Sequence, residues 1–237
     1  MGQLWKKVLK GIGLVTAVSV GEDGQFCLGD YRIYAKQEDG KSKIKLAREI
    51  IQNSNAKIVL FDAWYASKDL MNDLQKQEKV FYSTLPSSRV FYDTQNHKHK
   101  LKDYEFTEQE RRKGKIVQLN KMNFQVRIFR SCSKKGQAEI IVTNDIAQIS
   151  LEEAEKMFSS RPKIEEFHRE IKQLTGIEKC QARISRIQRN HICCCLMAWQ
   201  FLKNKAKLQN TTVYELHSRQ FNDFVRSQLV NPSLKFA

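Results

Sequence analysis

The first third of the chain alternates between strand-like and helix-like patterns. Residues 8–20 are rich in Val, Ile and Leu, and residues 26–34 alternate between apolar and polar side chains. The polar turn Gly21–Gly24 separates them, so the pattern predicts an antiparallel hairpin. Residues 42–52 then carry apolar side chains at helical spacing, which predicts an amphipathic helix.

A short apolar run at residues 57–61 is typical of a strand buried on both faces. It ends at Asp62. Ser67 is suited to cap a helix over residues 68–77, and residues 80–84 return as a strand. A hairpin followed by a helix-connected parallel pair indicates an α/β fold, in which reactive groups gather at the carboxyl ends of strands. Asp62 lies at such an end.

The middle of the chain reads as a β-rich insertion, because short alternating segments at residues 116–119, 124–129 and 139–142 are separated by polar turns. Two basic runs, His97–Lys100 and Arg111–Lys115, lie between them. Each run is either a solvated loop or a segment that follows a DNA backbone.

The last part is predicted to be helical. Ser150 and Glu153 form a capping-box pattern for a helix over residues 151–158. Pro162 suits the first turn of the next helix, which extends to Leu174, and residues 183–203 form a long third helix. The expected domains are therefore 1–86 and 148–237, two parts of one core, with the insertion at 87–147 between them.

Charge and cysteine content narrow the function. The chain has 237 residues with 41 Lys and Arg against 26 Asp and Glu, a net charge of +15. Such a protein is drawn to phosphate backbones or anionic membranes, and no apolar run is long enough to span a bilayer. Adjacent Cys193, Cys194 and Cys195 diverge on a helix, so core packing is expected rather than a zinc site. The cysteine pattern also suits a reducing cytosol.

The helix that starts at Pro162 carries the candidate chemistry. At 3.6 residues per turn, Glu165, His168, Arg169 and Lys172 share one face. The plainer alternative is a solvated face with a Glu165–Arg169 pair. Asp62 is a plausible partner for Glu165, because paired carboxylates suit Mg²⁺.

Several motifs resemble those of bacterial insertion-sequence transposases. The spacing Phe158, Arg161, Glu165, Lys172 resembles their Tyr-Arg-Glu-Lys signature, and residues 59–65 (Val-Leu-Phe-Asp-Ala-Trp-Tyr) look like their second-aspartate motif. The resemblance extends to Cys180-Gln181 and on to Arg189-Asn190-His191. It therefore covers nearly the whole chain, with its motifs in the same order.

This resemblance implies a DDE transposase with an RNase H-like core, a mixed sheet flanked by helices, interrupted by a β-rich insertion between the second Asp and the Glu. Asp62 and Glu165 would be two of three carboxylates that hold two Mg²⁺ or Mn²⁺ ions for phosphoryl transfer. Arg161 and Lys172 would bind phosphates at transposon ends.

Other positions are open to more than one interpretation. His168 suits DNA contact, orientation of Glu165 or a structural role. Arg169 shares its helix face and is a further candidate for DNA contact. The basic stripe of Arg183, Arg186 and Arg189 is either a phosphate-binding face or a solvated one.

The departures from the family pattern shape the expected function. Phe158 replaces the signature Tyr, Pro162 disfavours a helical Arg161, and neither Asp23 nor Asp30 matches the family's first Asp. The expectation is an N-terminally truncated fragment with an incomplete metal site, inactive alone.

Its expected partners are double-stranded DNA, both transposon ends and target, and a second copy or an intact transposase. The expected location is the bacterial cytoplasm, on the nucleoid, with no membrane. The alternative is a DNA-binding or inhibitory remnant without catalysis.

Overall fold

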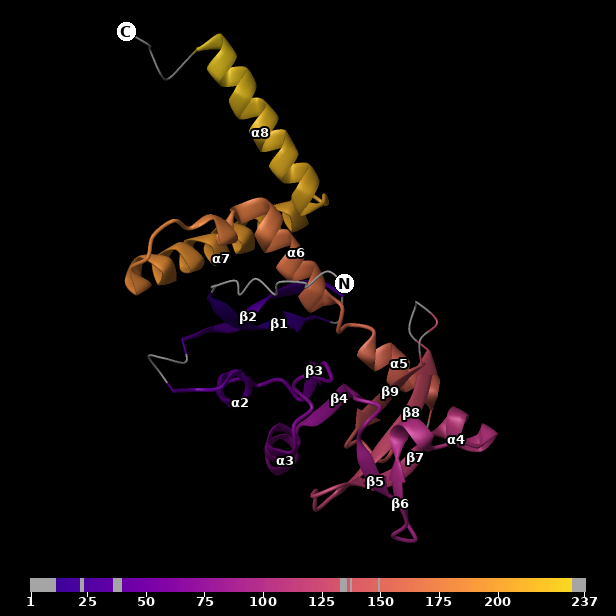
Figure 1. Ribbon diagram of the computed structural model, residues 1–237. Helices are drawn as coiled ribbons and strands as arrows, with labels where there is room; N and C mark the ends of the chain where they lie inside the picture. The colour runs from indigo at the N-terminus through magenta and orange to yellow at the C-terminus, as the bar shows by residue number, and fades with distance from the viewer. Residues whose placement is uncertain are drawn as a thin grey trace, which may run out of the picture. The chain divides into compact units, whose positions relative to one another are not determined.

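The computed structural model describes residues 12–21, 24–35, 40–132, 136, 138–148 and 150–231 (Figure 1). The chain divides into two compact units. The first combines Met1–Ala17 with Asp30–Pro162, and the second combines Val18–Gly29 with Lys163–Ala237. The predicted hairpin is present as strands β1 (Gly13–Val20) and β2 (Phe26–Tyr34), which pair in a two-stranded sheet and contribute to both units. The predicted residues 8–11 and Asp23 lie outside the described residues.

Side-chain caps fix where two helices of the first unit begin. Ser42 and Ser67 cap α2 and α3, each accepting a hydrogen bond from the backbone N–H three residues on. The sequence predicts the cap at Ser67, whereas it places Ser42 inside the helix. The elements of this unit, after the hairpin, are α2 (Lys43–Gln52), β3 (Ile58–Phe61), α3 (Lys68–Lys76), β4 (Val80–Leu85), β5 (Val90–Tyr92), β6 (Lys98–Lys100), a 3₁₀ turn (Leu101–Asp103), α4 (Glu108–Lys113), β7 (Lys115–Leu119), β8 (Gln125–Cys132), β9 (Ala138–Thr143) and α5 (Leu151–Phe158).

These strands form one mixed sheet in the order β3-β4-β9-β8-β7-β5-β6. β3 and β4 are parallel, with Ile58 opposite Val80 and Phe61 opposite Ser83, and the other pairs are antiparallel. The strands of residues 87–147 thus belong to the same sheet, and the predicted mixed α/β class is confirmed.

Neighbouring residues of β4 point to opposite faces of the sheet, as the pleat requires. Phe81 packs into a cluster with Leu70, Met71 and Leu74 of α3. Tyr82 packs with Ala154 of α5 in a second cluster that also holds Phe129 and Ile141. Helices therefore cover both faces.

One expectation about the sheet is wrong, and the loop alternative for the two basic runs does not hold. The run at residues 57–61 is not buried on both faces: Ile58 is 42% exposed, because β3 lies at an edge of the sheet in the described part of the chain. The basic runs are also not simple loops. Lys98–Lys100 forms β6, and Glu108–Lys113 forms α4, capped by the reciprocal Thr107–Glu110 box.

The second unit is built on helices α6 (Lys163–Thr175), α7 (Ser185–Leu208) and α8 (Val213–Val230), with a 3₁₀ turn at Ile177–Lys179. The sequence pattern predicts α6 and α7 but misses α8. Phe167 and Ile171 of α6 are buried, and Phe167 meets the Trp199 ring edge-on at 4.8 Å. Of the three adjacent cysteines only Cys195 is buried, whereas Cys194 is exposed, so the packing expectation holds for one.

Candidate active site and nucleic-acid interface

Asp62 lies directly after β3, at the carboxyl end of the parallel β3–β4 pair. Its Oδ1 accepts hydrogen bonds from the backbone N–H groups of Trp64 (3.1 Å) and Tyr65 (3.3 Å). The hydroxyl of Ser83 on β4 donates to the backbone carbonyl of Asp62 at 3.3 Å. Hydrogen bonds within the turn, and one from the neighbouring strand β4, therefore hold the turn that carries the Asp62 carboxylate.

The second oxygen of Asp62 faces a cation. Oδ2 lies 3.6 Å from Nη2 of Arg161, and the side chains of Asp62 and Arg161 are 41% and 27% exposed. Arg161 lies in the turn between α5 and Pro162, outside any helix, as expected for a residue before proline. The structure thus brings together two of the predicted site residues of the first unit.

Two aromatic side chains follow Asp62. The Trp64 ring is 59% exposed and meets the Tyr65 ring edge-on at 4.8 Å. Burial, and then the nearby Asp62 charge, raise the pKa of the Tyr65 hydroxyl, which keeps it neutral near pH 7. Trp64 is the more available of the two for stacking.

In the second unit, α6 separates its residues as the helical period predicts. Glu165, Arg169 and Lys172 are exposed and His168 is half-buried, while Phe167, Glu170 and Ile171 are buried. Burial, and then the Lys172 charge, lower the pKa of His168, so its imidazole is neutral at pH 7. Lys172 Nζ pairs with Glu178 at 2.8 Å. Because both partners are exposed, that ion pair is weak and its lysine can exchange to a phosphate.

The basic stripe of Arg183, Arg186 and Arg189 is exposed. Arg183 precedes α7, and the other two lie one turn apart at its start. Arg189 Nε donates to the Ser185 hydroxyl at 3.4 Å. The stripe thus presents positive charge to solvent beside the amino end of a long helix.

Sequence reasoning missed a buried charge on the opposite face of α6. Glu170 is only 3% exposed and accepts hydrogen bonds from Trp199 Nε1 (2.8 Å) and Lys203 Nζ (3.1 and 3.3 Å). Lys203 also lies over the Phe26 ring, 4.0 Å from its centroid, and Leu28 of the same strand donates its N–H to Gln200. Since these partners come from β2 and α7, no local spacing signals the cluster.

Carboxylate oxygens are the donors that hard divalent cations prefer, so the partly exposed Asp62 and the exposed Glu165 suit such an ion chemically. Within the described ranges, no three His, Cys, Asp or Glu side chains lie close enough to form a complete metal site. Asp30, in β2, uses its carboxylate locally, accepting from Arg32 at 2.6 Å and from the Tyr31 N–H at 2.7 Å.

A mixed sheet covered by helices, with a carboxylate at the carboxyl end of a parallel strand, is the arrangement of an RNase H-like phosphoryl-transfer fold. The transposase DDE domain family matches residues 15–201, so the chain belongs to this family, and the expected RNase H-like class is confirmed. No curated protein matches the chain.

Members of this family act in DNA transposition, bind DNA and use divalent metal ions. Across the residues described, no helix is both long and apolar enough to cross a bilayer.

Proposed function

We propose that the chain acts in DNA transposition as a catalytic domain of the insertion-sequence group with the Tyr-Arg-Glu-Lys signature. Asp62 and Glu165 would be the second and third acidic residues of its metal site. The observation that carries the proposal is the position of Asp62, fixed at the end of β3 beside Arg161 in a chain of the DDE family.

The chemistry of the residues fits a divalent cation. Asp62 Oδ1 accepts hydrogen bonds from two backbone amides, which orient the carboxylate, and Oδ2 faces Arg161 in a side chain that is 41% exposed. A bound Mg²⁺ or Mn²⁺ would supply Lewis acidity and lower the pKa of an attacking water or hydroxyl. The side chains of Asp62 and Glu165 would hold that ion.

The cations around the carboxylates have a separate task. A guanidinium such as Arg161 matches two phosphate oxygens, and Lys172 supplies a point charge. His168, Arg169 and the stripe of Arg183, Arg186 and Arg189 add positive or donor groups for a DNA backbone. Together they would position the scissile phosphate while excluding other orientations.

The departures from the signature are compatible with this role. Phe158 packs beside the cluster of Tyr82, Phe129 and Ala154, so its ring fills the place of the signature Tyr without the hydroxyl. Any hydrogen bond that the Tyr hydroxyl would make to DNA is therefore missing, whereas the packing of α5 is kept.

The test measures DNA binding with and without Ca²⁺, a divalent ion that binds carboxylates. The full chain should bind a 30-base-pair duplex in the absence of metal, and millimolar Ca²⁺ should tighten binding several-fold. Asp62→Asn and Glu165→Gln should each abolish the Ca²⁺ effect while keeping metal-free binding. Asp69→Asn, in the exposed first turn of α3, is the matched control and should behave as the parent.

Two results would overturn the proposal. The first is no binding to duplex DNA. The second is tight DNA binding that never responds to metal, which would favour a regulatory or inhibitory DNA-binding protein over a catalytic domain.

A further inference from the structure

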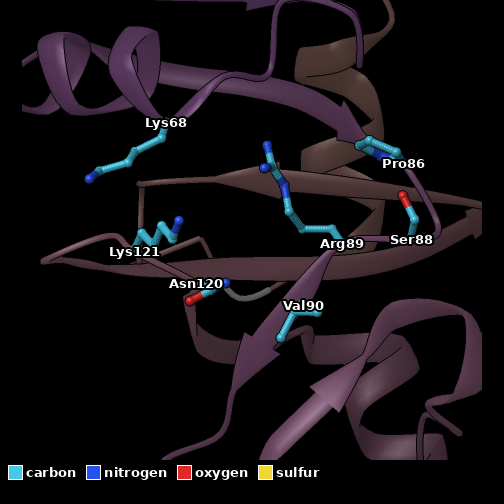
Figure 2. A pocket seen from close by; sticks show the side chains of 7 residues that line it. All are labelled: Lys68, Pro86, Ser88, Arg89, Val90, Asn120 and Lys121. Atoms are coloured by element: carbon cyan, nitrogen blue, oxygen red, sulfur yellow. The ribbon is translucent and has the colours of Figure 1, made fainter.

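A hollow of about 340 Å³ lies in the first unit, and neither Asp62 nor Arg161 is among its lining residues. Figure 2 shows three basic side chains around it, contributed by three separate segments: Lys68 opens α3, Arg89 precedes β5, and Lys121 follows β7. Ser88 and Asn120 add a hydroxyl and an amide. Among the described residues that line the hollow, none is acidic.

Its place in the fold is defined by the parallel strands. β3 ends at Phe61 and β4 ends at Leu85, so both carboxyl ends meet at one edge of the sheet. Pro86 and Ser88 follow β4 at that edge, and Lys68 opens the helix that connects the two strands. The hollow therefore lies at the same end of the sheet as Asp62.

The charges around the hollow are not neutralised within the described part of the chain. Lys68 and Lys121 form no ion pair or hydrogen bond there through their ammonium groups. Arg89 donates through Nη2 to the backbone carbonyl of Ala66, but its Nε is buried without a hydrogen-bond partner in the same described part. A buried donor without a partner is unfavourable, and water, an ion or a ligand can satisfy it.

The hollow is also held in shape by backbone hydrogen bonds. Arg89 N donates to Pro86 O at 3.0 Å, and Leu101 N donates to Arg89 O at 2.9 Å. Asn120 N donates to Val90 O at 3.1 Å, which joins the two loops.

Burial lowers the pKa of Arg89, yet no carboxylate compensates its charge among the residues described.

We propose that this hollow is a phosphate-binding site that takes a backbone phosphate of DNA. Its three cations and two neutral hydrogen-bonding side chains suit a compact anion with several acceptor oxygens. The choice of DNA as the source of the phosphate rests on the proposed function. The same chemistry would also accept a free phosphate or pyrophosphate.

The test compares two double variants that remove the same charge. Lys68→Gln/Lys121→Gln alters the hollow. Lys57→Gln/Lys76→Gln is the control, because Lys57 precedes β3 and Lys76 ends α3, at the opposite end of the parallel pair. Circular dichroism confirms folding of both.

The hollow variant should lose about one unit from the slope of log K for duplex DNA against log [salt], since each phosphate contact contributes about 0.9. The control should keep the parent slope. ³¹P NMR with pyrophosphate should also show weaker binding by the hollow variant than by the control.

The outcomes distinguish DNA from a free anion as the source of the phosphate, and the phosphate site from the metal site. Loss of pyrophosphate binding with an unchanged DNA slope would contradict DNA as the ligand and identify a free-anion site. No change in either measurement would overturn the phosphate site. The Ca²⁺ response of Asp62→Asn is measured independently, so failure of the metal site leaves this result interpretable.

Discussion

The carboxylate of Asp62 faces the guanidinium of Arg161, with Oδ2 and Nη2 3.6 Å apart. The acid lies at the end of a strand and the arginine in the turn before α6, yet both belong to the first unit. Because both groups are partly exposed, solvent screens the pair and its energy is small. The arrangement keeps a cation beside the carboxylate without fixing it there.

This pairing predicts that a substitution of Arg161 has opposite effects on the affinity for metal and on the affinity for DNA. Arg161→Gln removes a positive charge next to Asp62, so Mn²⁺ should bind about two- to threefold more tightly in the absence of DNA. The same variant should bind duplex DNA more weakly, with a shallower salt slope. Isothermal titration measures both, and Arg112→Gln on exposed α4 is the control that should leave Mn²⁺ affinity unchanged. Equal loss of metal and DNA affinity would contradict the interpretation.

The buried cluster of α6 and α7 predicts a non-additive stability effect. Lys203→Met leaves Glu170 buried without its cation and should destabilise the second unit by about 3–5 kcal/mol. Adding Glu170→Leu removes the uncompensated charge, and the double variant should recover part of the loss. Urea unfolding followed by near-ultraviolet circular dichroism measures each. A double variant no more stable than Lys203→Met would show that packing, not charge, dominates.

Gly114 ends α4 with φ 69° and ψ 173°, a conformation almost exclusive to glycine. A Cβ there would lie 2.6 Å from the Phe129 ring, which is fully buried. Gly114→Ala should cost about 2–4 kcal/mol, whereas Gly40→Ala, also at positive φ but in open space, should cost about 1 kcal/mol. Equal costs in thermal unfolding would indicate that the ring moves freely.

His168 predicts a pH dependence of stability. Its pKa is lowered in the fold, first by burial and then by Lys172, so the unfolded chain binds its proton at higher pH than the folded one. Stability should therefore be highest above the ordinary histidine pKa and fall as pH decreases from about 7 toward 5. His168→Gln should flatten this part of the profile, and His217→Gln, which keeps His168, should not. A parent profile flat over this range would contradict the burial effect.

The arginine stripe predicts a separable contribution to DNA binding. Arg186→Gln/Arg189→Gln should reduce the salt slope for duplex DNA by about two, since each arginine accounts for about one phosphate. The fold should be unaffected because both side chains are exposed. Fluorescence anisotropy at several salt concentrations measures the slope. An unchanged slope would show that the stripe is solvent-exposed but does not contact DNA.

What the sequence predicts well is local. Ser67 signals its helix because the cap and the apolar face lie within a dozen residues. Strands β7, β8 and β9 also follow from the alternation of apolar and polar residues. In contrast, the partial exposure of β3 depends on which strands lie beside it, and that is a property of the sheet rather than of the run itself.

The candidate site residues likewise include some that local patterns predict and some that they do not. Asp62 and the exposed face of α6 could be predicted, since strand ends and helical periods are readable. The Glu170–Lys203 pair could not, because its members are 33 residues apart on different helices. The hollow around Arg89 could not be predicted either, since it is assembled from three segments.

Asp62 and Glu165 are proposed to hold the same divalent ion, and paramagnetic broadening by Mn²⁺ distinguishes one shared site from two separate ones. In the isotope-labelled full chain with duplex DNA, amide signals of Trp64 and Tyr65 should broaden at the same Mn²⁺ concentration as those of Glu165 and His168. Either Asp62→Asn or Glu165→Gln should abolish both sets of changes. Broadening of the two sets at different Mn²⁺ concentrations, or a Glu165 set that survives Asp62→Asn, would contradict a shared metal site.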